Sequence, residues 1–131
     1  MSSPKAFLVG FPRCGSTFLA NVLIQHPHVF IPPEKEVNYF NKTFRYFGHP
    51  KIPSLDSKKS IGSYLEHYEE NLFGMDFSIL TAYDPTAAER MREVLGDIKI
   101  IVLVRDREHQ KKSFYNILKL NGDIRDISYE S

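Results

Sequence analysis

Residues 10–17 bring two glycines, a cation and two hydroxyl groups into eight positions, in the order Gly-Phe-Pro-Arg-Cys-Gly-Ser-Thr. A short apolar run over residues 6–9 precedes them and apolar side chains at helical spacing follow, so the pattern predicts a strand, a tight loop and a helix. Such a loop directs backbone N–H groups and the positive end of the helix dipole at one point. We therefore expect the segment to bind an anion such as a phosphate.

The spacing of this loop is close to the P-loop pattern G-x4-G-K-[ST], with one large difference. Gly10, Gly15 and Thr17 fit the pattern, but Ser16 stands where the lysine that reaches the β- and γ-phosphates is expected. A cation inside the loop, Arg13, is present instead. The loop is thus predicted to hold its anion in a manner that differs from ATP binding. A plain strand-to-helix turn is the simpler alternative.

Two further groups able to do chemistry follow predicted strands. Arg105 comes directly after the apolar run 99–104, with Ser113 eight residues beyond it, and Glu36 lies shortly after the apolar run 29–31. In open α/β sheets, ligands bind beyond the carboxyl ends of the strands. The arginine would offer a planar, two-pronged donor to an anionic group, and the glutamate could take a proton from a hydroxyl. A surface arginine and a solvated glutamate are the alternatives.

The elements that must position these residues alternate along the chain. Capping residues and a glycine mark the expected helix ends: Ser60 and Asp84 are expected N-caps, and Gly96 is expected to end a helix. The alternation predicts a three-layer α/β/α sandwich with a mostly parallel, P-loop-like sheet. The run 99–104 is apolar throughout and is expected to be the central strand. The predicted strands are 5–10, 29–31, 77–83 and 99–104, and the predicted helices are 16–26, 60–72, 85–95 and a last one reaching Leu120.

Length and composition are those of an ordinary globular protein. With 131 residues, of which 42% are hydrophobic and 25% charged, the chain is expected to form one domain over residues 1–131. A net charge of +1 gives no support to a general nucleic-acid or membrane-surface binder. The single cysteine, Cys14, excludes an internal disulfide and fits a reducing compartment. No apolar run is long enough to cross a bilayer, so a cytoplasmic location is expected.

Taken together, segments 7–17, 36–40 and 100–113 resemble the sulfotransferases that use 3′-phosphoadenosine-5′-phosphosulfate (PAPS), above all the heparan sulfate N- and 3-O-sulfotransferases and their bacterial and viral relatives. The family loop P-x-[KR]-x-G-[ST]-T is matched at Arg13, Gly15, Ser16 and Thr17, with Pro12 directly before the arginine. The family motif E-x-x-[FY]-F is reproduced by residues 36–40. The motif R-D-P-x-x-R-x-x-S is matched at Arg105, Asp106 and Ser113, with Arg107 in place of the proline and Gln110 in place of the second arginine.

The resemblance implies a role for each matched residue. The loop, with Arg13, Cys14, Gly15, Ser16 and Thr17, would bind the 5′-phosphosulfate of PAPS, and Arg13 would also act on the transferred group. Arg105 and Ser113 would bind the 3′-phosphate. Glu36 would be the catalytic base that deprotonates an acceptor hydroxyl or amine. No metal would be needed, because the cations come from the protein.

Three alternatives remain open. A shortened, non-catalytic relative that binds a nucleotide or a partner chain is the strongest, because family members continue well past the 3′-phosphate helix. A P-loop nucleotide kinase would need a lysine at Ser16. A cysteine-dependent phosphatase would need an arginine six residues after Cys14, where Ala20 stands.

The expected partners follow from the resemblance and the composition. They are a nucleotide donor and a glycan or small-molecule acceptor, without nucleic acid or membrane. A homodimer is left open, since a second copy would cover an exposed edge of a shortened sheet.

Overall fold

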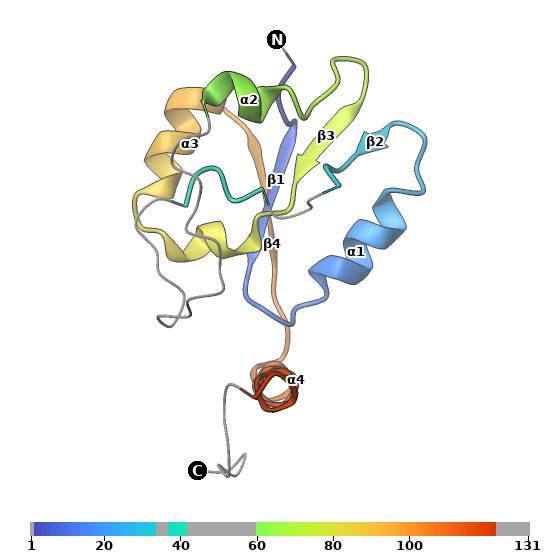
Figure 1. The fold of residues 1–131 in the computed structure, drawn as a ribbon, viewed down its shortest axis with the longest axis vertical. Coiled ribbons are helices and arrows are strands. Elements are labelled where there is room, and N and C mark those ends of the chain that lie inside the picture. The colour runs from blue at the N-terminus through green and yellow to red at the C-terminus, as the bar shows by residue number, and fades with distance from the viewer. Residues whose placement is uncertain (1, 34–36, 42–59, 123–131) are drawn as a thin grey trace.

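Four parallel strands form one sheet in the order β2-β3-β1-β4 (Figure 1). A computed structural model describes residues 2–33, 37–41 and 60–122, and the statements below concern those residues. The order places β1, the strand that leads into the glycine-bearing loop, between two neighbours. The strands are β1 (Ala6–Gly10), β2 (Val29–Phe30), β3 (Phe73–Asp76) and β4 (Lys99–Leu103).

Helices cover both faces of the sheet, which confirms the predicted α/β fold class with its parallel sheet. Helix α1 lies on one face, and α2 and α3 lie on the other (Figure 1). Helix α4 lies beyond the carboxyl end of β4 and projects from the sheet (Figure 1). The helices are α1 (Ser16–Leu23), α2 (Ile61–Leu65), the 3₁₀ helix η1 (Ile79–Tyr83), α3 (Ala87–Leu95) and α4 (Arg107–Leu120).

Alternation along β1 builds a separate core on each face of the sheet. Ala6 and Leu8 are buried with Ala20 of α1 on one face. Phe7 is buried on the other face with Tyr64 of α2 and with α3. Because successive strand residues point to opposite faces, the side chains of this one short strand pack into the cores on both faces of the sheet. The loop that follows β1 thus leaves a strand that is buried on both faces.

The prediction that residues 99–104 form the central strand is wrong for the part of the chain that the structure describes. Strand β4 lies at the edge of the sheet, beside β1. Ile100 and Val102 are 48% and 54% exposed. A run of β-branched residues indicates a strand built to be covered on both faces, but it carries no information on which neighbours cover it.

The prediction of a strand over residues 77–83 is also wrong. Strand β3 ends at Asp76, and the next residues form η1. The Asp76 carboxylate accepts hydrogen bonds from the Ser78 backbone N–H at 2.9 Å and from the Ser78 hydroxyl at 2.5 Å. This local aspartate turn diverts the backbone from the sheet ladder.

Two predicted helix ends are confirmed: Ser60 caps α2 by accepting from the Ser63 N–H, and Gly96 ends α3 with a φ of 69°. The predicted N-cap Asp84 is wrong, because the N-cap of α3 is Thr86 and the helix begins two residues later than expected. The Asp84 side chain instead accepts from the Thr86 N–H in a turn before the helix. Asp106 caps α4 by accepting from the His109 N–H. These bonds satisfy backbone groups that helix ends leave unpaired.

Candidate anion-binding site

The loop over residues 11–15 leaves the carboxyl end of β1 and ends at the N-terminus of α1. Glycine is required at Gly10, because a Cβ atom there would lie 2.9 Å from the Leu103 carbonyl oxygen of β4. Gly15 is the N-cap of α1 and has a φ of 89°, a left-handed conformation that glycine adopts without strain. The loop therefore delivers backbone N–H groups and the positive end of α1 to one place.

Arg13 has a left-handed backbone, with a φ of 66°. Residues other than glycine adopt this conformation rarely, and it persists only where neighbouring groups enforce it. Its side chain is exposed, and the Arg13 Nε donates to the Ser113 Oγ at 2.9 Å. The two ends of the guanidinium fork remain available to an anion.

The end of β4 and helix α4 hold the loop from the other side. The Arg105 guanidinium donates to the Arg13 carbonyl at 3.1 Å, and the Gln110 side-chain amide donates to the Pro12 carbonyl at 2.9 Å. Arg13 is thus brought to Arg105 and Ser113, although it is 92 and 100 residues away from them in the chain. The structure assembles the predicted cationic residues of the loop and of the second strand end at one point.

The N-terminus of α4 carries a carboxylate, that of Asp106, at the positive end of the helix dipole. Asp106 is exposed, and the hydrogen bond that its carboxylate accepts from the His109 N–H lowers the pKa of Asp106 below its usual range. A carboxylate at a helix N-terminus is favourable because of the helix dipole. Arg105 and Asp106 do not form an ion pair among the interactions described for residues 60–122, and Arg105 contacts the loop instead.

Cys14, the residue after Arg13, is half-buried and carries a free thiol. Burial, and secondly the neighbouring Cys14, raises the pKa of Tyr83 in η1. The rings of Phe11 and Tyr83 meet edge to face, 5.5 Å apart. The inner side of the loop thus packs against η1, and Cys14 fits the expected position of a small residue inside an anion loop.

The predicted base, Glu36, lies outside the described residues. The described residues that follow it, 37–41, are held by polar contacts. The Asn38 N–H donates to the Ser78 Oγ at 2.7 Å, and Asn38 has a φ of 56°. Arg90 donates to the Phe40 carbonyl, and Thr81 donates to the Asn41 side chain.

Two buried carboxylates support those contacts. Asp84 pairs with Arg90 at 2.8 Å, and the Asp84 side chain is fully buried. Asp76 is fully buried and accepts from the Tyr64 hydroxyl at 2.7 Å as well as from Ser78. Burial, and secondly the nearby Asp76, raises the pKa of Tyr64, so its hydroxyl stays protonated and donates. Sequence patterns did not reveal this support, because apart from the Asp76–Ser78 pair its partners are 6 to 50 residues apart.

Replacing Asp76 with asparagine is expected to change how stability depends on pH. Burial raises the pKa of Asp76 above 3.8, and the hydrogen bonds from Ser78 and Tyr64 only partly oppose this. Protonation of Asp76 therefore stabilises the folded state. This contribution to the free energy of unfolding is complete below pH 3.8 and is lost as the pH rises through the pKa of Asp76 in the folded state. Urea titrations from pH 4 to 8 should show the free energy of unfolding of the wild type falling relative to that of Asp76→Asn. A pH-independent difference between the two proteins would contradict this.

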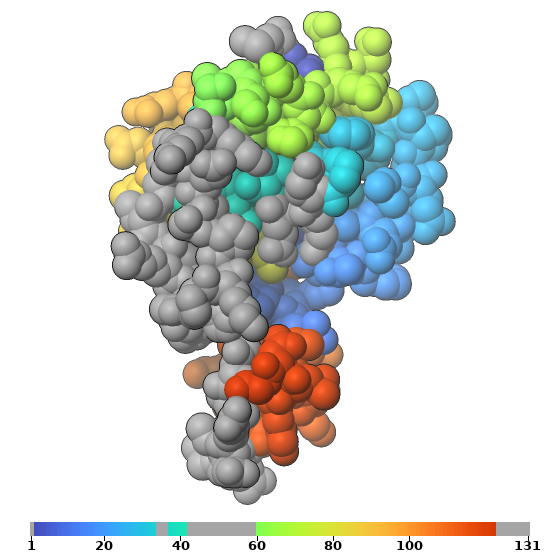
Figure 2. All heavy atoms as spheres, viewed as in Figure 1, coloured from blue at the N-terminus to red at the C-terminus, as the bar shows by residue number. Residues whose placement is uncertain are grey.

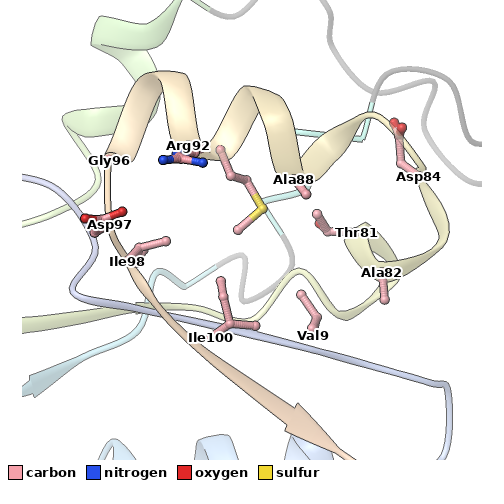
Figure 3. A pocket seen from close by; sticks show the side chains of 11 residues that line it. Val9, Thr81, Ala82, Asp84, Ala88, Arg92, Gly96, Asp97, Ile98 and Ile100 are labelled. Carbon is pink, nitrogen blue, oxygen red and sulfur yellow. The ribbon is translucent and has the colours of Figure 1, made fainter.

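A cavity of about 500 Å³ lies beneath α3, between η1 and β4 (Figure 3). Its walls are largely apolar, from Val9, Met91, Ile98 and Ile100, with Asp84 and Arg92 among the polar lining residues. None of the residues assigned to the anion site from the sequence lines this cavity. The predicted site residues and the cavity therefore occupy different parts of the fold.

Within residues 2–33, 37–41 and 60–122, no three histidine, cysteine, aspartate or glutamate side chains come together in a way that could hold a metal ion. In the same ranges no helix has both the length and the apolar character to cross a membrane.

One contact of the site was not foreseen. Gln110 was noted in the sequence only as a departure from the second arginine of R-D-P-x-x-R-x-x-S. Its bond to Pro12 joins residues 98 positions apart, which no local pattern encodes. The replacement of the motif's second arginine by Gln110 was the one feature of the sequence that set this position apart.

Known proteins resemble this chain in sequence and in fold. The family model described as "Sulfotransferase family" matches residues 4–73. The chain is 29% identical over 119 residues to the "Membrane-associated sulfotransferase kil1" of Dictyostelium discoideum, covering 86% of this chain and 22% of that protein. The crystal structure of a sulfotransferase from Alicyclobacillus acidocaldarius is similar with a TM-score of 0.77 and 25% identity, covering 99% of this chain and 55% of that one. The chain thus spans about a fifth of the curated relative and about half of the solved one.

Proposed function

Because this chain belongs to the sulfotransferase family, we propose that it binds PAPS and transfers the sulfuryl group to a hydroxyl or amine of a glycan or small-molecule acceptor. The observation that carries the proposal is the meeting of Arg13, Arg105 and Ser113 at the mouth of the loop. Two arginines beside a helix N-terminus suit a ligand with two separated anionic groups. PAPS has such groups, a 5′-phosphosulfate and a 3′-phosphate.

The donor set of the site fits this nucleotide. The loop N–H groups of Cys14, Gly15 and Ser16, with the Ser16 and Thr17 hydroxyls, would hold the 5′-phosphosulfate. Arg105 and Ser113 would hold the 3′-phosphate, with Ser113 free to donate its own hydrogen while its oxygen accepts from Arg13 Nε. Arg13 lies between the two groups of donors and would reach the sulfuryl group.

The transfer would be an in-line displacement at sulfur. Glu36 would take the proton of the acceptor, whose oxygen or nitrogen forms the new bond to sulfur. The bond from sulfur to the phosphate oxygen breaks, and 3′,5′-bisphosphoadenosine leaves with that oxygen's negative charge. Arg13 and the loop N–H groups would stabilise this growing charge, which is how fixed donors accelerate group transfer.

A comparison of nucleotide binding tests the proposal most directly. Calorimetry should show binding of 3′,5′-bisphosphoadenosine without added metal and much weaker binding of ATP. Transfer of labelled sulfate from PAPS to a panel of glycans, phenols and amines then tests turnover. Magnesium-dependent binding of ATP in preference to the bisphosphate would instead favour a nucleotide kinase, and tight binding without transfer to any acceptor would favour a non-catalytic module.

Replacing Arg105 with alanine is expected to weaken 3′,5′-bisphosphoadenosine binding by roughly 10- to 100-fold, because a charge-assisted hydrogen bond contributes about 1.5–3 kcal/mol. Adenosine 5′-monophosphate, which lacks the 3′-phosphate, should lose much less affinity. Arg92→Ala, which removes an exposed arginine on α3, is the matched control and should bind as the wild type does. Equal losses for both ligands would argue against a 3′-phosphate role for Arg105.

A further inference from the structure

Two consecutive carbonyl groups of the loop accept hydrogen bonds from side chains far away in the sequence. The Pro12 carbonyl accepts from Gln110, and the Arg13 carbonyl accepts from Arg105. Gln110 lies in the first turns of α4 and is half-buried, whereas its neighbours along the helix are exposed. The loop is therefore held at its left-handed residue, Arg13.

The planarity of the peptide bond makes these contacts important for anion binding. In a trans peptide the C=O and the following N–H point in opposite directions. Fixing the Pro12 carbonyl toward Gln110 therefore fixes the direction of the Arg13 N–H, and fixing the Arg13 carbonyl does the same for the Cys14 N–H. Two successive donors of the loop are thereby set by groups that lie outside the loop.

The contact from Gln110 also ties helix α4 to the loop. The helix has no buried residue along its length, and it projects from the body of the fold next to the end of β4 (Figure 1). The space-filling view shows its atoms against the lower edge of the N-terminal part of the fold (Figure 2). Polar contacts from Gln110 and Ser113 thus join α4 to the loop.

We propose that Gln110 is a positioning residue for the anion-binding loop: it holds the Pro12–Arg13 peptide in the orientation that a 5′-phosphosulfate would need. The identity of that ligand rests on the proposed function, but the holding of the loop does not. Gln110 and Arg105 both donate to the loop backbone, but Gln110 is neutral and so brings no charge to the 3′-phosphate donors. A neutral amide can hold the carbonyl without adding charge beside the 3′-phosphate donors.

The single cysteine of the chain provides a test that needs no ligand. Cys14 follows the Pro12–Arg13 peptide and is half-buried. The rate at which its thiol reacts with a neutral disulfide reagent therefore rises when the loop becomes more mobile. Gln110→Met has nearly the same length but no donor. It should raise the rate, extrapolated to full ionisation of the thiol, by roughly three- to tenfold, the factor that one lost hydrogen bond implies.

Three controls separate positioning from a general loss of structure. Gln110→Arg restores a donor and should return the Cys14 rate to within about twofold of the wild type, on the scale of a single bond. Gln110→Asn keeps the amide but is too short to reach Pro12, and should behave as Gln110→Met does. Asn116→Met removes an exposed amide from the same helix and should leave the rate unchanged. Equal Cys14 rates in folded Gln110→Met and wild type would overturn the proposal.

Nucleotide affinity supplies the second readout. Gln110→Met should weaken 3′,5′-bisphosphoadenosine roughly three- to tenfold and leave adenosine 3′-monophosphate unchanged, because only the former has a 5′-phosphate for the loop. An equal loss for both ligands would overturn the positioning role. If the wild type binds neither nucleotide, the proposed function fails, while the Cys14 rates still decide whether Gln110 holds the loop.

Discussion

Glutamine in place of Glu36 is expected to lower kcat for sulfate transfer from PAPS by about 10²–10⁴-fold, the range that removal of a general base produces. Glutamine has nearly the same shape as glutamate but cannot accept the acceptor's proton. The affinity for 3′,5′-bisphosphoadenosine should be unchanged, since a base acts on the acceptor and not on the nucleotide. Glu36→Gln should therefore lower kcat and leave nucleotide affinity unchanged.

A matched control is available two residues away. Glu34→Gln removes a carboxylate from the same short segment and should leave kcat within a fewfold of the wild type. Labelled-sulfate assays on the best acceptor from the panel, at saturating PAPS, provide the measurement. Equal losses of turnover in Glu34→Gln and Glu36→Gln, or a Glu36→Gln variant with undiminished kcat, would remove Glu36 from the role of base.

Replacing Arg13 with alanine is expected to lower kcat by about 10²–10³-fold, as removal of one donor from a charge-stabilising site does. Arg13 lies in the loop itself, and its side chain is oriented by the bond to Ser113 at 2.9 Å. Its fork would act on charge that grows only as the bond to sulfur breaks. Turnover should consequently fall more than the affinity for 3′,5′-bisphosphoadenosine.

Arg13→Lys distinguishes the cation from the rest of the side chain. The family pattern P-x-[KR]-x-G-[ST]-T accepts either residue, so lysine should retain most of the activity. Single-turnover transfer and bisphosphate binding should be measured on both variants. If Arg13→Ala loses affinity and keeps kcat, the residue serves binding alone.

Local patterns were sufficient for the elements that carry the anion site. The glycines, Arg13 and the hydroxyl residues lie within eight positions, so strand, loop and helix could be assigned from neighbours in sequence. The predicted cap at Ser60 is likewise local. Where the prediction failed, at residues 77–83, a side chain overrode an apolar pattern, since Asp76 binds Ser78 and turns the chain into η1.

The sequence by itself determined the α/β architecture, the family and the strand-loop-helix segment that contains Arg13, because each depends on residue types at short, fixed spacing. Only the tertiary structure decided that β4 lies at the sheet edge and that Arg105 contacts the Arg13 carbonyl. It alone revealed that Gln110 holds Pro12. These features join residues 92 to 98 positions apart, and such contacts follow from how strands are ordered in space, which local periodicity does not encode.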